Sequence, residues 1–170
     1  MNAKEIQTEF IKTYLKPTLK VYGYQTSGQT WWKNMSDFFI IINLQNSQWN
    51  SKEELSFCFN IGIALTEKIK DPKKKKATYF DILTHTREET YLSENRKKGK
   101  YRESGWLGYR ITENTNLEDF INELKIDFEN DILTILEKLK TLKDCVEFYG
   151  KIKIWGEILN EQIIKIGLKV

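Results

Sequence analysis

Residues 38–65 read FFIIINLQNSQWNSKEELSFCFNIGIAL, and this stretch sets the architecture of the chain. Two apolar runs, Phe38–Gln45 and Leu55–Leu65, have the length and alternation of β-strands. The polar loop Asn46–Ser51 between them is short, so we expect the two strands to pair antiparallel. One alternate set of side chains is wholly apolar and predicts the face that helices cover, namely Phe38, Ile40, Ile42, Leu44, Leu55, Phe57, Phe59, Ile61 and Ile63.

The opposite face of the same two strands collects polar side chains. Its members are Asn43, Gln45, Ser56, Cys58 and Asn60. If Ser104–Ile111 forms a further strand, alternation adds Trp106 and Arg110 to this face. Amides, an arginine and a tryptophan can orient a ligand through hydrogen bonds and stacking. Antiparallel sheets also commonly leave one face in water, and the sequence leaves both interpretations open.

Helical periodicity flanks this pair of strands on both sides. We expect an N-terminal helix over Ala3–Lys20, with a kink or a restart at Pro17. Apolar residues recur every three or four positions over Leu117–Leu139 and predict a long helix, with Thr115 as its cap. Two shorter helices are expected over Thr141–Tyr149 and around Trp155–Ile166.

Further strands complete the predicted sheet. Ser27-Gly28 is typical of a hairpin turn, here between Tyr22–Thr26 and Gln29–Lys33. The Thr-rich segment Thr84–Leu92 predicts another strand, joined to Ser104–Ile111 through a loop at Arg96–Lys100. The fold class is therefore α+β: an antiparallel sheet of about five to six strands, packed on one face by the N-terminal helix and the C-terminal helices. We expect one domain over residues 1–150 and a helical extension over residues 151–170.

The composition excludes several classes of protein. The chain has 170 residues, 40% hydrophobic and 30% charged, with 2 Cys and 1 His. Two cysteines and one histidine provide neither zinc spacing nor a disulfide framework, so no metal site is predicted and a reducing cytoplasm is expected. The longest apolar run, Phe38–Ile42, is too short to span a bilayer.

No catalytic set emerges from the titratable residues. His85 has no nucleophile motif near it in sequence and is expected at the surface or rim. Glu88 and Glu89 would point to opposite sides of a strand and would not form an acid–base pair. Glycine-rich phosphate loops are absent.

Charge is distributed unevenly along the chain. Residues 68–102 contain twelve basic and five acidic residues, whereas residues 111–139 contain eight acidic and two basic ones. A lysine run beside aromatic residues can bind nucleic acid. Because no RNA-recognition or helix-turn-helix pattern accompanies the run, we interpret the two regions as solvated surfaces that can also steer a protein partner.

Several motifs resemble one family. They are the Lys-Pro-x-Leu-Lys-x-x-Gly-Tyr stretch at Lys16–Tyr24, the aromatic strand at Thr30–Trp32, the stretch Ile42–Asn50 and the stretch Phe59–Ile63. Together they resemble the bacterial domain-of-unknown-function family four-three-zero-four over about Glu5 to Tyr149. Arg87-Glu88-Glu89-Thr90 departs from the Arg-Ile-Gly stretch usual in such proteins. The resemblance implies a fold and no activity.

The sequence favours a non-catalytic cytoplasmic domain that binds a protein partner. By analogy of fold, a toxin-neutralising immunity protein is one such domain. The alternative is a small ligand-binding protein or enzyme that uses the polar sheet face, with Arg110 meeting a small anionic ligand. The candidate binding residues are Asn43, Gln45, Trp49, Asn50, Asn60, Trp106 and Arg110. No catalytic residue and no cofactor is predicted, and neither nucleic acid nor a membrane is expected as a partner.

Overall fold

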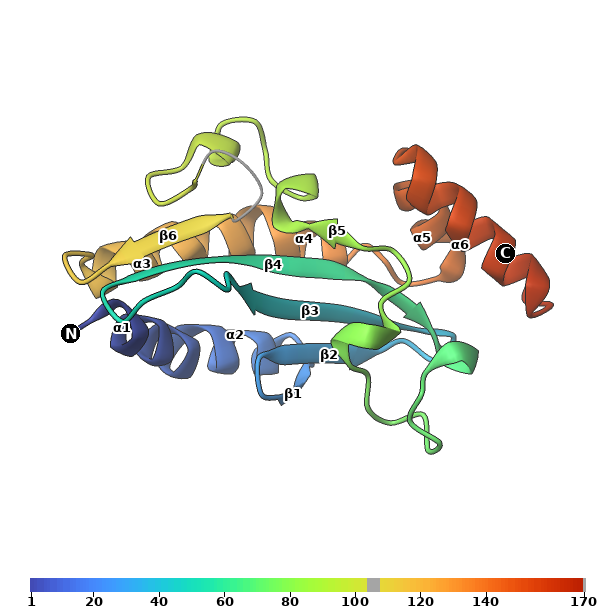
Figure 1. Ribbon diagram of the computed structural model, residues 1–170. Coiled ribbons are helices and arrows are strands. Elements are labelled where there is room, and N and C mark those ends of the chain that lie inside the picture. Colours follow the sequence, from blue (N-terminus) through green and yellow to red (C-terminus); the bar gives the residue numbers. More distant parts are fainter. Residues whose placement is uncertain (104–107, 170) are drawn as a thin grey trace.

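A six-stranded antiparallel sheet with helices along one face forms the structure (Figure 1). The computed structural model describes residues 1–103 and 108–169. The strands are β1 (Gln25–Ser27), β2 (Thr30–Asn34), β3 (Phe38–Asn46), β4 (Glu54–Leu65), β5 (Thr86–Arg87) and β6 (Tyr109–Thr112). The helices are α1 (Ala3–Phe10), α2 (Lys16–Val21), α3 (Leu117–Lys125), α4 (Leu133–Leu136), α5 (Leu142–Tyr149) and α6 (Lys153–Lys165). The predicted α+β class is confirmed.

β4 is the central strand of the sheet. One edge pairs with β3 along its length, from Phe38 opposite Leu65 to Asn46 opposite Phe57. The other edge pairs with β6 near the start of β4 and with β5 farther along. Because directly opposed residues share a face, this register fixes which side chains meet on each side of the sheet.

The main core lies between the helices and the predicted apolar face. Phe57 and Phe59 are fully buried there, and the Phe59 ring packs edge-on against Phe128 at 4.9 Å. Phe10 of α1 stacks on Phe57 at 5.5 Å, so the N-terminal helix is held by the same aromatic cluster. This is the face that alternation along β3 and β4 predicts.

Part of the second face is also covered. Residues 66–83 fold over its far end and bury an apolar cluster against it. Gly62 allows this approach, since a Cβ there would lie 2.0 Å from the carbonyl oxygen of Thr84. The end near the β3–β4 loop carries the polar side chains Asn43, Gln45 and Asn60. The cluster at the far end consists of Trp32, Phe39, Ile41, Ala64, Ile69, Ala77 and Ile82.

Both long helical runs contain π-helical turns. Ile11–Leu15 joins α1 to α2, and Pro17, whose missing N–H predicts a kink or a restart, is the second residue of α2. Ile126–Ile132 joins α3 to α4, and the run ends at Leu136. The predicted cap Thr115 is wrong, because Asn116 caps α3 by accepting the Asp119 N–H at 2.9 Å.

The strand predicted over Thr84–Leu92 is mostly wrong. Only Thr86–Arg87 pairs with β4, and a 3-10 turn follows at Glu88–Thr90. Arg96–Lys98 forms another 3-10 turn rather than a hairpin loop, since β5 and β6 each pair with β4 and not with one another. An isolated antiparallel bridge joins Arg102 to Tyr109, and side-chain contacts hold much of the rest of the segment between β5 and β6.

Candidate functional site

Three amides meet at the polar end of the second sheet face. The β3–β4 register places Asn43 opposite Asn60 and Gln45 opposite Cys58. The Asn60 amide donates to Gln45 Oε1 at 2.7 Å and to Asn43 Oδ1 at 3.4 Å. Asn43 Nδ2 donates in turn to Thr30 Oγ1 at 2.9 Å. The three amides therefore satisfy one another and the edge of β2, which removes much of the cost of burying Asn60.

Arg110 shares this face but not this cluster. It pairs in register with Ser56, on the side of β4 away from the amides. Its guanidinium forms two hydrogen bonds with the Glu54 carboxylate, at 2.9 and 2.8 Å. The planar fork that suits an anion is thus already held by a carboxylate of the same sheet. Trp106 lies outside the described residues.

Cys58 sits beside the amides as a protonated thiol. Arg87 Nη1 donates to its sulfur at 3.1 Å, yet burial is the largest effect and raises the Cys58 pKa. Burial also raises the pKa of Cys145 to about 12. Nucleophilic cysteines need a lowered pKa, so neither thiol has the electrostatics of a reactive one.

Trp49 stands fully in solvent at the tip of the β3–β4 loop. Its side chain is 86% exposed, as large a fraction as any hydrophobic residue of the described chain. The sequence allowed either a side chain tucked onto the sheet edge or an interface anchor, and the structure shows the exposed position. An exposed tryptophan leaves a large apolar area in water, which favours its burial by a partner.

Hydrogen bonds hold the loop that carries Trp49. Asn50 Nδ2 donates to the Ser56 carbonyl at 3.0 Å, and Asn50 Oδ1 accepts the Ser56 N–H at 2.7 Å. Ser51 Oγ accepts the N–H groups of Glu53 and Glu54, at 3.2 and 3.1 Å. Asn50 therefore bonds both backbone groups of Ser56 on the edge of β4 that faces β3, and this closes the loop. Trp49 is thus presented from a pre-organised turn.

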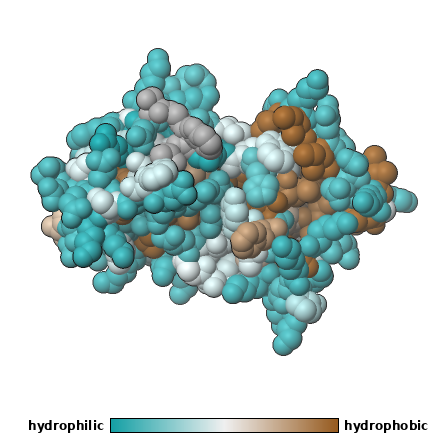
Figure 2. Space-filling model, viewed as in Figure 1, coloured by the Kyte–Doolittle hydropathy of each residue, from teal (hydrophilic) through white to brown (hydrophobic). Residues whose placement is uncertain are grey.

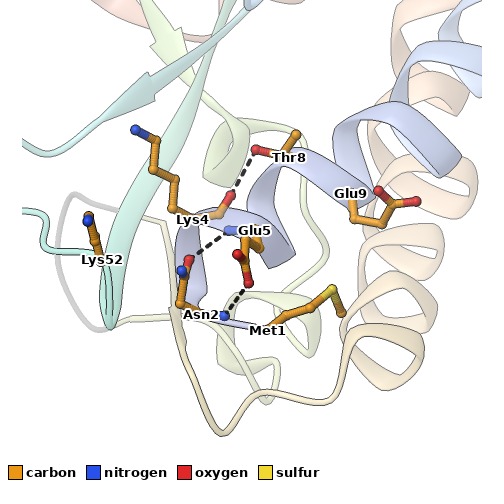
Figure 3. A pocket seen from close by; sticks show the side chains of 7 residues that line it. All are labelled: Met1, Asn2, Lys4, Glu5, Thr8, Glu9 and Lys52. Carbon is orange, nitrogen blue, oxygen red and sulfur yellow. Dashed lines mark hydrogen bonds between the residues drawn. The ribbon is translucent and has the colours of Figure 1, made fainter.

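A polar groove adjoins this loop. A cavity of about 380 Å³ lies between α1 and the loop, and Gln7 and Asn46 line it while exchanging hydrogen bonds of 2.7 and 3.3 Å. Lys4 and Lys52 line it too, and they also line a neighbouring open pocket at the start of α1. Figure 3 shows both lysines extending to the same side, whereas Glu9 points away from them.

A buried ionic network is the feature that sequence reasoning missed. The side chains of Arg102 and Glu88 are 2% and 1% exposed, and Arg102 Nη1 donates to Glu88 Oε1 at 2.6 Å. Arg102 Nη2 also donates to Glu89 at 2.9 Å. The expectation that Glu88 and Glu89 diverge is therefore wrong, because they lie on a 3-10 turn and share one guanidinium.

The network continues to the helices. Arg102 lies 4.8 Å from the centre of the Tyr109 ring, and the Tyr109 hydroxyl donates to Asp127 at 2.7 Å. Arg96 donates to the other Asp127 oxygen at 2.6 Å. In the sequence, Asp127 directly precedes Phe128 on the core-facing side of the predicted helix. That position is the sequence signal by which the burial of its carboxylate could have been predicted. These contacts fasten residues 88–102 to the domain.

His85 is exposed, as the sequence predicts. Its ring lies 5.6 Å from the Tyr79 ring and 5.9 Å from the Trp155 ring, and partial burial lowers its pKa.

Within residues 1–103 and 108–169, no group of three His, Cys, Asp or Glu side chains could hold a metal ion. In the same ranges, no helix combines the length and apolar character needed to cross a membrane.

Comparison with protein families identifies one match. The model of the family described as Domain of unknown function (DUF4304) matches residues 15–138. The chain belongs to DUF4304. The matched region runs from the end of the first helical segment to just beyond α4 and so includes the whole sheet and the Trp49 loop. Neither the curated proteins nor the solved structures contain a match to this chain.

Proposed function

We propose that this DUF4304 protein is a non-catalytic protein-interaction domain that binds its partner through the Trp49 loop. The observation that carries the proposal is a tryptophan 86% exposed on a turn fixed by side-chain hydrogen bonds. Interfaces concentrate binding energy in buried aromatic anchors, and a pre-organised anchor loses little entropy on binding.

The surroundings of Trp49 support the same proposal. The groove with Gln7, Asn46, Lys4 and Lys52 provides the polar rim that surrounds such anchors. The amides of the sheet face are paired with one another, which disfavours a small ligand held among them. Arg110, the residue predicted to meet an anion, is engaged by Glu54. These contacts favour a protein partner over the small-ligand alternative.

The proposal places the domain in the cytoplasm. Both cysteines are free and buried, and they form no disulfide. Free thiols are the rule in reducing compartments. Neutralisation of a toxin stays a prediction within the same class of function.

Photo-crosslinking tests the proposal. A benzoylphenylalanine replaces Trp49 in one protein and Val21 in a control, because Val21 is equally exposed at 86% on the end of α2. Both proteins are expressed in the source cells and irradiated. We expect one discrete protein adduct from position 49 and none from position 21. Absence of an adduct at position 49, or the same adducts at both positions, would contradict the proposal.

A further inference from the structure

A second surface lies away from the Trp49 loop, and it combines lysines with exposed apolar side chains. Residues 66–81 leave the end of β4 and project beyond β2, at the lower right of Figure 1. Residues 66–81 contain six lysines, all between Lys68 and Lys76, and three acidic residues, Glu67, Asp71 and Asp81. Among the described residues, none of these six ammonium groups forms an ion pair. This lysine loop, residues 66–81, therefore carries an excess of positive charge, six lysines against three acidic residues.

The lysine loop is a built structure. The Asp71 carboxylate accepts the backbone N–H groups of Lys73, Lys75 and Lys76, at 3.2, 2.9 and 3.0 Å. Trp32 Nε1 donates to the Lys75 carbonyl at 3.1 Å and ties the loop to the sheet. These bonds fix the backbone from which the lysine side chains project, which lowers the backbone entropy lost when the loop binds.

Apolar side chains begin directly beside the lysines. Phe80 is 75% exposed, and the Lys70 ammonium lies 5.4 Å from the centre of its ring. Phe80 contacts Tyr79, Tyr79 contacts His85, and His85 contacts Trp155, with ring centres 5.6, 5.6 and 5.9 Å apart.

This aromatic row reaches α6, which exposes its own apolar residues. Ile154, next to Trp155, is 64% exposed, and Ile164 is more so. Figure 2 shows hydrophobic surface gathered over α6, on the same half of the molecule as the projecting lysine loop. The lysine loop, the aromatic row and the start of α6 thus form one surface.

We propose that this surface docks onto an anionic lipid bilayer. Every cation of the loop is a lysine, a point charge that suits diffuse attraction to a charged surface. Protein interfaces and bidentate phosphate recognition favour arginine, and lysine is depleted at protein interfaces. Aromatic and aliphatic side chains beside lysines can enter the interfacial layer while the ammonium groups meet the headgroups. This revises the expectation of no membrane partner, which rested on the length of the apolar runs.

Vesicle co-sedimentation tests the proposal. The full chain is mixed with phosphatidylcholine vesicles, with or without phosphatidylserine, at low and high salt. We expect binding only to the anionic vesicles and weakening by salt. Lys73→Glu/Lys75→Glu/Lys76→Glu should weaken binding by about a hundredfold or more, from the typical contribution of a lysine near a charged leaflet. Phe80→Ala should weaken it by about tenfold.

Two controls make the result decisive. Lys16→Glu/Lys20→Glu/Lys138→Glu changes the net charge equally at exposed lysines elsewhere and should leave vesicle binding nearly unchanged. Equal loss in this variant would overturn the proposal, since net charge alone would then explain the binding. Single-stranded DNA and polyglutamate serve as soluble polyanions. Binding to either polymer as tight as binding to the anionic vesicles, and insensitive to Phe80→Ala, would also overturn it.

Discussion

Arg102→Met breaks the buried pair with Glu88 and should strongly destabilise the fold. Methionine keeps part of the apolar stem but removes the guanidinium that meets Glu88 at 2.6 Å. The Glu88 carboxylate then remains buried with only the Phe59 N–H, at 2.7 Å, as a described partner. Removing one partner of a buried ion pair costs about 3–5 kcal/mol, and we expect a loss of unfolding free energy of that size.

The loss should depend on pH because Glu88 can take up a proton. Burial raises the pKa of Glu88, and Arg102 opposes that rise. Without Arg102 the folded-state pKa rises further above its unfolded value, so the folded chain binds more protons than the unfolded chain. The unfolding free energy then falls as the pH rises through this window. Arg102→Met should therefore be less destabilising at about pH 5 than at about pH 8.

Urea denaturation followed by tryptophan fluorescence measures the effect at both pH values. Glu88→Gln/Arg102→Met is the control, because it removes both charges. It should recover much of the lost unfolding free energy and abolish the extra pH dependence. A loss below about 1 kcal/mol for Arg102→Met, the range of surface pairs, would refute the reasoning. An equal loss at both pH values would refute it as well.

Three further substitutions probe the core, the close contact between Gly108 and Glu88, and the loop that carries Trp49. Phe59→Ala should cost about 3–5 kcal/mol in urea denaturation, as large truncations of buried rings do. Gly108→Ala should lower the melting temperature, because φ is 72° there and a Cβ would lie 2.3 Å from Glu88 Oε1. Asn50→Ala should cost about 1–3 kcal/mol and speed hydrogen exchange at the Ser56 amide, whose acceptor it removes.

Each of these three changes has an outcome that would contradict it. Phe80→Ala is the matched control for Phe59→Ala, since its ring is exposed, and equal losses in the two variants would reject the core assignment. An unchanged melting temperature for Gly108→Ala would show that the backbone there adapts. Unaltered exchange at Ser56 in Asn50→Ala would show that the loop does not depend on the Asn50 side chain.

The central sheet and its two faces could be predicted because alternation is local. Phe57 and Phe59 lie on the buried face and Asn43, Gln45 and Asn60 lie together on the other, as period-two patterning requires. The second face was harder, since burial of its far end depends on residues 66–83 folding back over it. No local pattern in that lysine-rich segment indicates such contact.

The segment around Glu88 and Arg102 could not be predicted from propensity. Threonines favoured a strand there, but the backbone turns after Arg87. The carboxylates of Glu88 and Glu89 are held by Arg102, and Arg96 reaches Asp127 thirty-one positions away. Tertiary ion pairs therefore override local preference at this point. Trp49 was recognised as a candidate anchor, but its exposure depends on how Asn50 closes the loop.

The affinity of the partner captured through position 49 tests the proposed interaction most directly. Isothermal titration would compare the unaltered chain, Trp49→Ala and Val21→Ala, with the two substitutions at equally exposed positions. A central aromatic anchor contributes about 2–4 kcal/mol, so Trp49→Ala should weaken binding by about thirtyfold or more while Val21→Ala leaves it unchanged. Equal affinities for all three proteins would contradict the assignment of Trp49 as the anchor.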